Sequence, residues 1–133
     1  RDEWSAGPRA YLGVAVPGFP NLFVVTGPGS PSVLSNMVVS IEQHVEWIGD
    51  CLAHAREKGF TTVEATEAAQ DQWMAQVAAV ASFTVWPTGD SWYTGANIPG
   101  KARSFPIFLG GVGTYRQICA DVAAKGYEGF VLR

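Results

Sequence analysis

The sequence has 133 residues, of which 47% are hydrophobic and only 16% are charged, and its formal net charge is −3. This length is enough for one domain with a hydrophobic core. The net negative charge and the lack of a basic run argue against nucleic acid and against an anionic membrane surface as partners. No apolar stretch reaches the ~20 residues of a membrane span. The high apolar content indicates either a compact core or an apolar surface that packs against another chain.

The sequence begins at Arg1 without an initiator methionine, so we expect a processed or excised piece of a longer chain. Its two cysteines, Cys51 and Cys119, lack the spacing of a metal site or of a CxxC redox motif. We expect both to be reduced structural thiols in a cytoplasmic protein.

Two short strands are predicted near the N-terminus. Residues 10–16 form an apolar run that stops at a Pro-Gly pair, and residues 21–26 form a second run. Because the second run is mostly apolar, it is predicted to be buried on both faces, as in a parallel sheet. A Gly/Pro/Ser-rich turn at residues 27–31 then leads into a helical pattern. Such a unit gathers free backbone N–H groups and the positive end of a helix dipole, which suits a phosphate or an electron-rich ring. Many α/β proteins nevertheless bind nothing there.

A long helix is predicted over residues 34–58, with Ser32 or Ser35 as its N-cap and Lys58-Gly59 as its end. Its predicted buried stripe consists of apolar residues at steps of three and four, namely Val38, Ile41, Val45, Ile48, Leu52 and Ala55.

A short extended piece is predicted at residues 61–65. Thr66 and Glu67 then open a second helix, which places Trp73, Val77 and Val80 on one face. We interpret Trp73, and also Trp47 on the first helix, as packing residues.

Residues 83–105 show no periodicity and are predicted to form a long loop. Loops of this length are usually functional lids or disordered segments, and the aromatic residues here argue against simple disorder. A further strand is predicted at residues 105–109 and a last one at residues 127–132. Between them, Thr114 and Gln117 fit a capping box for a helix over residues 115–125, which Gly126 ends.

Few residues carry an obvious chemistry. His44 and His54 lie ten positions apart on one predicted helix, about 80° apart around its axis, so they do not converge on one metal ion. The sequence contains no dinucleotide fingerprint, no phosphate-binding P-loop and no hydrolase nucleophile elbow. Nothing local supplies a catalytic triad or an acid–base pair, so the residues by themselves indicate a binding surface without a catalytic residue of its own.

Three separated motifs give a more specific indication. They are FPNLFVVTGPGSPSVLSNMVVSIEQHVEWI (residues 19–48), DSWYTGANIPGK (residues 90–101) and YRQICADVAAKGYEGFVL (residues 115–132). Together they resemble the C-terminal part of type I Baeyer–Villiger monooxygenases, in the phenylacetone and cyclopentadecanone monooxygenase branch. The family's N-terminal FAD motif, its NADP-domain glycine motif, its FxGxxxHxxxWP signature and its flavin-stabilising arginine are not in this sequence.

The resemblance implies a fold, an activity and two cofactors. The fold is α/β, the C-terminal portion of a Rossmann-like FAD-binding domain with few strands, three helices and a long mobile loop. Residues 1–60 would form the strand–turn–helix beside the flavin, residues 83–105 a control loop, and residues 106–133 a C-terminal strand and helix. The family uses NADPH, FAD and O₂ to convert a ketone into an ester or lactone.

Site residues follow from the same resemblance. Backbone N–H groups near Asn36 and Met37 would face the pyrimidine edge of FAD. Trp92 would reach the NADP ribose, with Asn97 and Lys101 as secondary contacts. The matching ketone pocket comprises Pro31, Ser32, Val33, Leu34 and Met37.

Two alternatives stay open: a flavin monooxygenase that oxidises nitrogen or sulfur, and a non-catalytic domain remnant that associates with itself. For either form of the parent enzyme, the expected main partner of this chain is the N-terminal part of the same enzyme.

Overall fold

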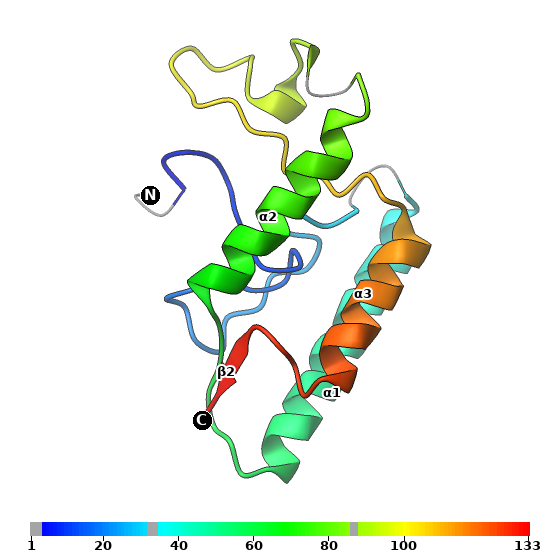
Figure 1. Ribbon diagram of the computed structural model, residues 1–133. Helices are drawn as coiled ribbons and strands as arrows, with labels where there is room; N and C mark the ends of the chain where they lie inside the picture. Colours follow the sequence, from blue (N-terminus) through cyan, green and yellow to red (C-terminus); the bar gives the residue numbers. More distant parts are fainter. Residues whose placement is uncertain (1–3, 32–34, 86–87) are drawn as a thin grey trace.

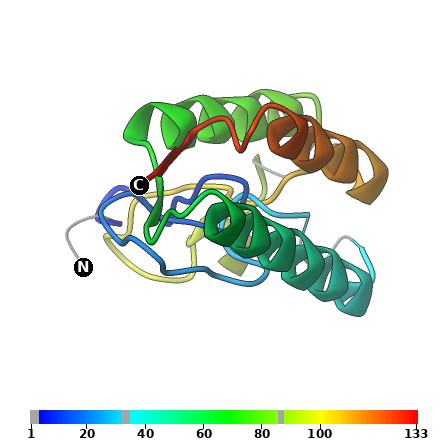
Figure 2. The ribbon, with the colours of Figure 1, turned by 90° about the horizontal axis from the view of Figure 1, so that it is seen from below.

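The computed structural model describes residues 4–31, 35–85 and 88–133. In these ranges the elements follow the order α1 (Met37–Glu57), β1 (Val63–Ala65), α2 (Glu67–Ser82), the short 3₁₀ helix η3 (Trp92–Thr94), α3 (Val112–Ala124) and β2 (Phe130–Leu132). Figure 1 shows α2 and α3 side by side, with the irregular segment between them at one end, and Figure 2 shows α1 in a second layer against α3. The predicted α/β class is confirmed in this coarse form.

The sheet has two antiparallel strands, in which Val63 lies opposite Leu132 and Ala65 opposite Phe130. The strands expected within residues 61–65 and 127–132 are therefore confirmed, although each is shorter. The strands expected at residues 10–16, 21–26 and 105–109 are wrong. Within the described residues the first two contribute only isolated bridges, and the third is irregular. The parallel sheet expected from residues 21–26 is likewise not formed in the described part of the chain.

The first of these corrections has a clear physical cause. The backbone N–H of Tyr11 donates to the carbonyl of Ala15 at 2.8 Å, so residues 10–16 turn back on themselves. Leu12 and Gly13 sit at positive φ, 53° and 73°, which no extended strand allows. The apolar composition of this run therefore reflects its burial, and the backbone itself is not extended.

Residues 105–109 pair with a turn instead of with a strand. Gly29 donates to the carbonyl of Pro106 at 2.8 Å, and Phe108 donates to the carbonyl of Ser30 at 3.0 Å. These bonds tie the loop before α3 to the turn before α1.

Local signals explain most of the helix ends. The N-cap of α1 is Asn36, whose Oδ1 accepts from the Val38 N–H, in place of the expected Ser35; Ser32 lies outside the described residues. Lys58 and Gly59 end α1 as expected. The Thr66 side chain caps α2 by accepting from the Ala69 N–H.

The start of α3 differs from the expected capping box. The helix begins at Val112 with Gly111 as its N-cap, so Thr114 lies inside its first turn. The amide of Gln117 instead bonds the carboxylate of Asp121, one turn further along α3.

The predicted buried stripe of α1 is wrong for four of its six residues, whereas Ala55 is buried and Ile48 is half-buried against the core. Val38, Ile41, Val45 and Leu52 are exposed, and the buried face carries Ser40, Gln43, His44, Trp47, Cys51 and Ala55. Polar atoms explain the choice of face, because the Trp47 indole donates to the carbonyl of Cys119 on α3 at 2.9 Å and His44 is hydrogen-bonded on both ring nitrogens. As a result, α1 has an apolar face, with Val38, Ile41, Val45 and Leu52, that is left largely exposed in the described chain.

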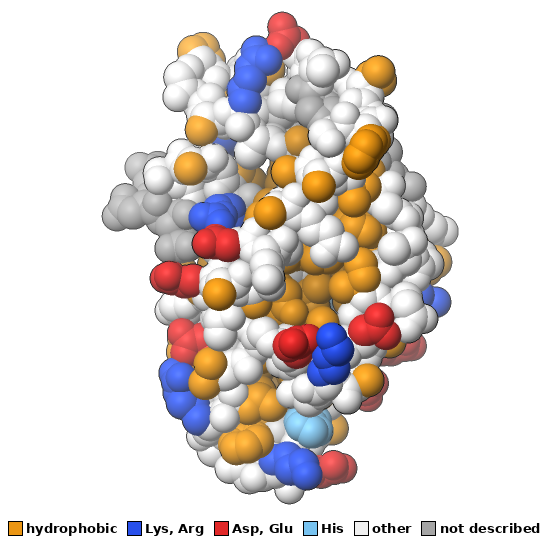
Figure 3. All heavy atoms as spheres, in the orientation of Figure 1, with side chains coloured by type: hydrophobic (Ala, Val, Ile, Leu, Met, Phe, Trp, Pro, Cys, Tyr) orange, Lys and Arg blue, Asp and Glu red, His pale blue; other side chains and the backbone are white. Residues whose placement is uncertain are grey.

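The core lies between the helices and the N-terminal segment. Trp73 of α2 stacks on Phe108 with ring centroids 5.2 Å apart, and Trp47 meets Tyr127 edge-on. Both tryptophans are buried, which confirms their expected packing role, and Cys51 and Cys119 are buried free thiols. Figure 3 shows hydrophobic side chains gathered along the seam between α2 and α3, with charged groups around it. No helix in the described ranges has the length and apolar character to cross a membrane.

Candidate functional site

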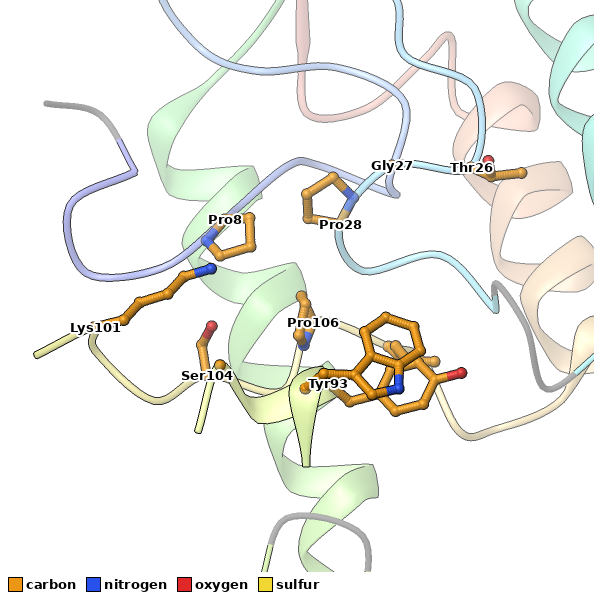
Figure 4. Close-up of a pocket in the computed structure, with 11 residues that line it drawn as sticks. Pro8, Thr26, Gly27, Pro28, Tyr93, Lys101, Ser104 and Pro106 are labelled. Carbon is orange, nitrogen blue, oxygen red and sulfur yellow. The ribbon is translucent and has the colours of Figure 1, made fainter. Parts of the chain in front are cut away.

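A cleft of about 340 Å³ is the candidate site, and it is built from three segments that are far apart in the sequence. Pro8 comes from the N-terminal segment, Thr26, Gly27 and Pro28 from the turn before α1, and the remaining lining residues from positions 92–107. Figure 4 shows Pro28 between the Pro8 side and the Tyr93 side of this cleft.

The turn at residues 26–28, which we call the 26–28 turn, is held in place by backbone hydrogen bonds. Gly27 donates to the carbonyl of Gly13 at 3.0 Å. A Cβ on Gly27 would lie 2.7 Å from that carbonyl oxygen, so only glycine allows the two backbones to approach this closely. The wall of the cleft is thus set by a backbone contact that a side chain would break.

The opposite wall is aromatic. Trp92 and Tyr93 open η3 and stack on each other, with ring centroids 3.8 Å apart. Thr94 holds the turn by donating its hydroxyl to the carbonyl of Ser91 at 2.9 Å. Trp92 is 65% exposed, which leaves a large aromatic surface available to a ligand.

One cation lies in the lining. Lys101 is exposed and lines both this cleft and a neighbouring apolar groove of about 900 Å³. The adjacent Arg103 is paired with Asp90 at 2.7 Å. The cleft therefore combines an aromatic face, backbone groups and an ammonium group, a set that suits an aromatic ring attached to an anionic group.

The structure brings together some of the expected site residues and separates others. Trp92 and Lys101 share the cleft, whereas Asn97 is exposed and is not in its lining. Asn36, the N-cap of α1, is exposed, and Met37 is half-buried. Neither these two nor the buried Pro31 line the cleft. The expected pocket residues Ser32, Val33 and Leu34 lie outside the described residues.

Sequence reasoning did not assign a site role to Tyr93, Ser104 or Pro106, all of which line the cleft. Tyr93 could have been found, because it is adjacent to Trp92. Ser104 and Pro106 carry no comparable signal, since long-range backbone bonds, such as the one from Gly29 to Pro106, bring that segment to the turn.

A metal centre has no support in the described part of the chain, where no group of three or more His, Cys, Asp or Glu side chains could hold an ion. His44 is buried and faces the 26–28 turn, while the ring of His54 packs near Tyr127 with centroids 5.2 Å apart.

Comparison with known proteins identifies the relatives of this chain. No family model matches it. It is 41% identical over 130 residues to a cyclohexanone 1,2-monooxygenase of an Acinetobacter species, covering 98% of this chain and 24% of the relative. The crystal structure of cyclohexanone monooxygenase from Rhodococcus sp. Phi1 bound to NADP⁺ matches with a TM-score of 0.93 and 42% identity, over 99% of this chain and 24% of that one.

Its homologues include Baeyer–Villiger monooxygenases. The chain is similar to a C-terminal segment of these enzymes and spans about a quarter of their length. A phenazine N-monooxygenase of Lysobacter antibioticus is 40% identical over 130 residues, again covering 98% of this chain and 24% of the relative. This chain thus also has a relative that is named for oxidation at nitrogen.

Proposed function

We propose that this chain is part of a Baeyer–Villiger monooxygenase that uses NADPH, FAD and O₂ to convert a ketone into an ester or lactone. The observation that carries the proposal is the cleft, in which the 26–28 turn faces Trp92 and Lys101, in a chain whose homologues are such enzymes. The three motifs of residues 19–48, 90–101 and 115–132 support the phenylacetone and cyclopentadecanone branch. We assign no catalytic residue to the chain itself.

The cleft fits the nicotinamide cofactor. The Trp92 indole N–H can donate to a ribose hydroxyl, and its exposed ring can cover an aromatic ring. Lys101 offers an ammonium group to a phosphate, and Asn97, on the same loop, is the secondary contact. In this role residues 83–105 form a control loop that covers the cofactor and excludes water from the reacting atoms.

The start of α1 fits the pyrimidine edge of FAD. The first turn of α1 has no acidic residue, and the Asn36 side chain already caps the Val38 N–H. Near Asn36 and Met37 the helix therefore presents its positive end, which stabilises negative charge on a neighbouring ring. Bound FAD, reduced by NADPH, supplies the electrons and carries the oxygen that is inserted next to the carbonyl.

The ketone pocket is assigned to Pro31, Ser32, Val33, Leu34 and Met37. Pro31 is buried and Met37 is half-buried beside the start of α1. Apolar side chains here suit a substrate that is recognised mainly by its shape.

The exposed face of α1 supports the rest of the enzyme as the main partner. Val38, Val45 and Leu52 are each 45% exposed or more, and large apolar side chains on one helix face are normally covered. In the enzyme, residues 1–60 and 106–133 would complete a Rossmann-like FAD domain whose other part supplies this cover. Self-association of the chain through the same face is the alternative.

The decisive experiment is Trp92→Ala in a full-length enzyme that carries this segment, with Phe83→Ala as the control. Phe83 is 90% exposed and does not line the cleft. We expect Trp92→Ala to raise KM for NADPH about tenfold, the cost of one hydrogen bond, with FAD retention unchanged. Equal loss of NADPH use and FAD content would contradict the cofactor-lid role.

Oxidation at nitrogen is the second candidate function, because of the phenazine N-monooxygenase relative. The same full-length enzyme decides between the two, since a ketone yields an ester or lactone and an aromatic amine an N-oxide. Turnover of the amine alone would favour the second candidate.

A further inference from the structure

A buried hydrogen-bond chain links α1 and α3 to the cleft. The backbone N–H of Thr26 lies 2.8 Å from Nδ1 of His44, and Nε2 of His44 lies 2.7 Å from the Tyr115 hydroxyl. The Tyr115 hydroxyl in turn donates to the carbonyl of Leu12 at 2.5 Å. His44, Tyr115 and Leu12 are all at most 1% exposed.

The geometry determines where each proton lies. A backbone N–H can only donate, so Nδ1 of His44 must be the acceptor and carry no proton. A neutral imidazole then has its proton on Nε2, which donates to Tyr115, and Tyr115 donates onward to Leu12. The three hydrogen bonds can form together only when Nδ1 of His44 accepts and Nε2 carries the proton, which fixes the tautomer of His44.

The two residues at the ends of this hydrogen-bond chain have an unfavourable backbone conformation. Thr26 has φ of 54° and Leu12 has φ of 53°, and this left-handed region is unfavourable for a non-glycine residue. The two turns are also bonded to each other, because Gly27 donates to Gly13. His44 and Tyr115 therefore hold a pair of strained turns from two different helices.

We propose that His44 is a positioning residue for the cleft, which holds the 26–28 turn in place by accepting from the Thr26 N–H. Thr26 and Gly27 line the cleft opposite Trp92, so the imidazole sets the distance between the two walls without contacting a ligand. The position of the turn follows from the hydrogen bonds alone, and the effect on NADPH rests on the proposed function.

Two near-isosteric variants separate positioning from simple core filling. The Asn oxygen in His44→Asn can take the place of Nδ1, so it keeps the acceptor for Thr26. The amide in His44→Gln reaches the place of Nε2, so it keeps a partner for Tyr115 and loses the acceptor for Thr26.

The first readout is hydrogen exchange of backbone amides in the ¹⁵N-labelled 133-residue chain. We expect the Thr26 amide to exchange about tenfold faster in His44→Gln, relative to the Trp47 amide in α1, and to keep its protection in His44→Asn. Loss of protection at Thr26 and Trp47 in parallel, or equal behaviour of the two variants, would overturn the proposal.

A second readout needs no variant. In the unsubstituted chain at pH 7, the imidazole ¹⁵N shifts should show Nδ1 without a proton and Nε2 with one. The opposite tautomer, or a charged ring, overturns the proposal even if both variants fail to fold.

In the full-length enzyme, His44→Gln should raise KM for NADPH more than His44→Asn does. If hydrogen exchange at Thr26 changes as expected but the two variants have the same KM for NADPH, the proposed function of the cleft is contradicted. The role of His44 in holding the turn would then stand.

Discussion

Nδ1 of His44 accepts a 2.8 Å hydrogen bond from the backbone N–H of Thr26, eighteen residues earlier in the chain. The bond joins the buried face of α1 to a turn that lines the cleft. A buried histidine that does not line the cleft is thus bonded directly to the backbone of one of its walls.

The pH dependence of stability should report on His44. Burial lowers its pKa from 6.5 to about 4, so in the folded chain it stays neutral where the unfolded chain already takes up a proton. Burial also raises the pKa of Tyr115, whose hydroxyl is bonded to Nε2 of His44, well above 10, so that group stays neutral as well. We expect the free energy of unfolding to fall by about 3 kcal/mol as the pH drops from 6.5 to 4, from 1.36 kcal/mol per pKa unit.

Urea unfolding at a series of pH values measures this effect, and His44→Asn is the control. The difference in the free energy of unfolding between the unsubstituted chain and His44→Asn should be constant above pH 6.5 and shrink below it. A difference that is independent of pH would mean that His44 titrates normally in the folded chain.

Gly27→Ala and Gly49→Ala should have opposite effects on stability. A Cβ at Gly27 would lie 2.7 Å from the Gly13 carbonyl, whereas a Cβ at Gly49, within α1, meets nothing within 4 Å. We expect Gly27→Ala to destabilise the chain by about 1–3 kcal/mol through the backbone clash. Gly49→Ala should stabilise it by roughly 0.5–1 kcal/mol because alanine is the better helix former. Thermal unfolding followed by circular dichroism measures both, and a stable Gly27→Ala chain would argue against the close approach of the two turns.

The 133-residue chain by itself should neither hold one equivalent of FAD nor oxidise NADPH. It spans about a quarter of the length of its relatives and contains no dinucleotide-binding glycine motif. Gel filtration followed by a visible spectrum and an intact mass checks this. Yellow protein at a mass near 14.2 kDa, with flavin in equal amount, would contradict it.

Val45→Lys should affect the full-length enzyme more than the chain alone. Val45 is 55% exposed on the uncovered face of α1, so a lysine there should change the stability of the chain by about 0.5 kcal/mol or less. In the full-length enzyme the same lysine would be buried against the remaining chain and should lower both melting temperature and FAD retention.

Glu46→Gln, at the neighbouring exposed position, is the matched control, because it also raises the net charge by one. Equal effects of Val45→Lys in the two settings would argue against a covering partner. A dimer of the chain that dissociates on Val45→Lys would identify a second copy as that partner.

Much of the helical framework could be predicted from the sequence. The C-terminal end of α1 and the start of α2 follow from residues that act locally, namely Lys58-Gly59 and the capping hydroxyl of Thr66. The packing of Trp47 and Trp73 also follows from their size and helical spacing. The expected cofactor contacts Trp92 and Lys101 came from the DSWYTGANIPGK motif, and both line the cleft.

The strands and the buried face of α1 could not be predicted in the same way. The apolar run at residues 10–16 correctly indicates burial, but not whether the backbone is extended. For residues 21–26 the predicted burial on both faces is wrong as well, because Leu22 and Val25 are 49% and 40% exposed. Likewise, the apolar stripe from Val38 to Leu52 has the better periodicity although it is largely exposed, whereas the buried face of α1 includes the polar residues Ser40, Gln43 and His44.

By itself, the sequence determined where the helices lie and which loop carries the exposed tryptophan, because caps, glycines and helical periodicity act within a few residues of each other. Only the tertiary structure decided which face of α1 is buried and which segments meet at the cleft. Those choices depend on long-range bonds, from Thr26 to His44, from His44 to Tyr115 and from Gly29 to Pro106, between residues with no mark of their pairing in the sequence.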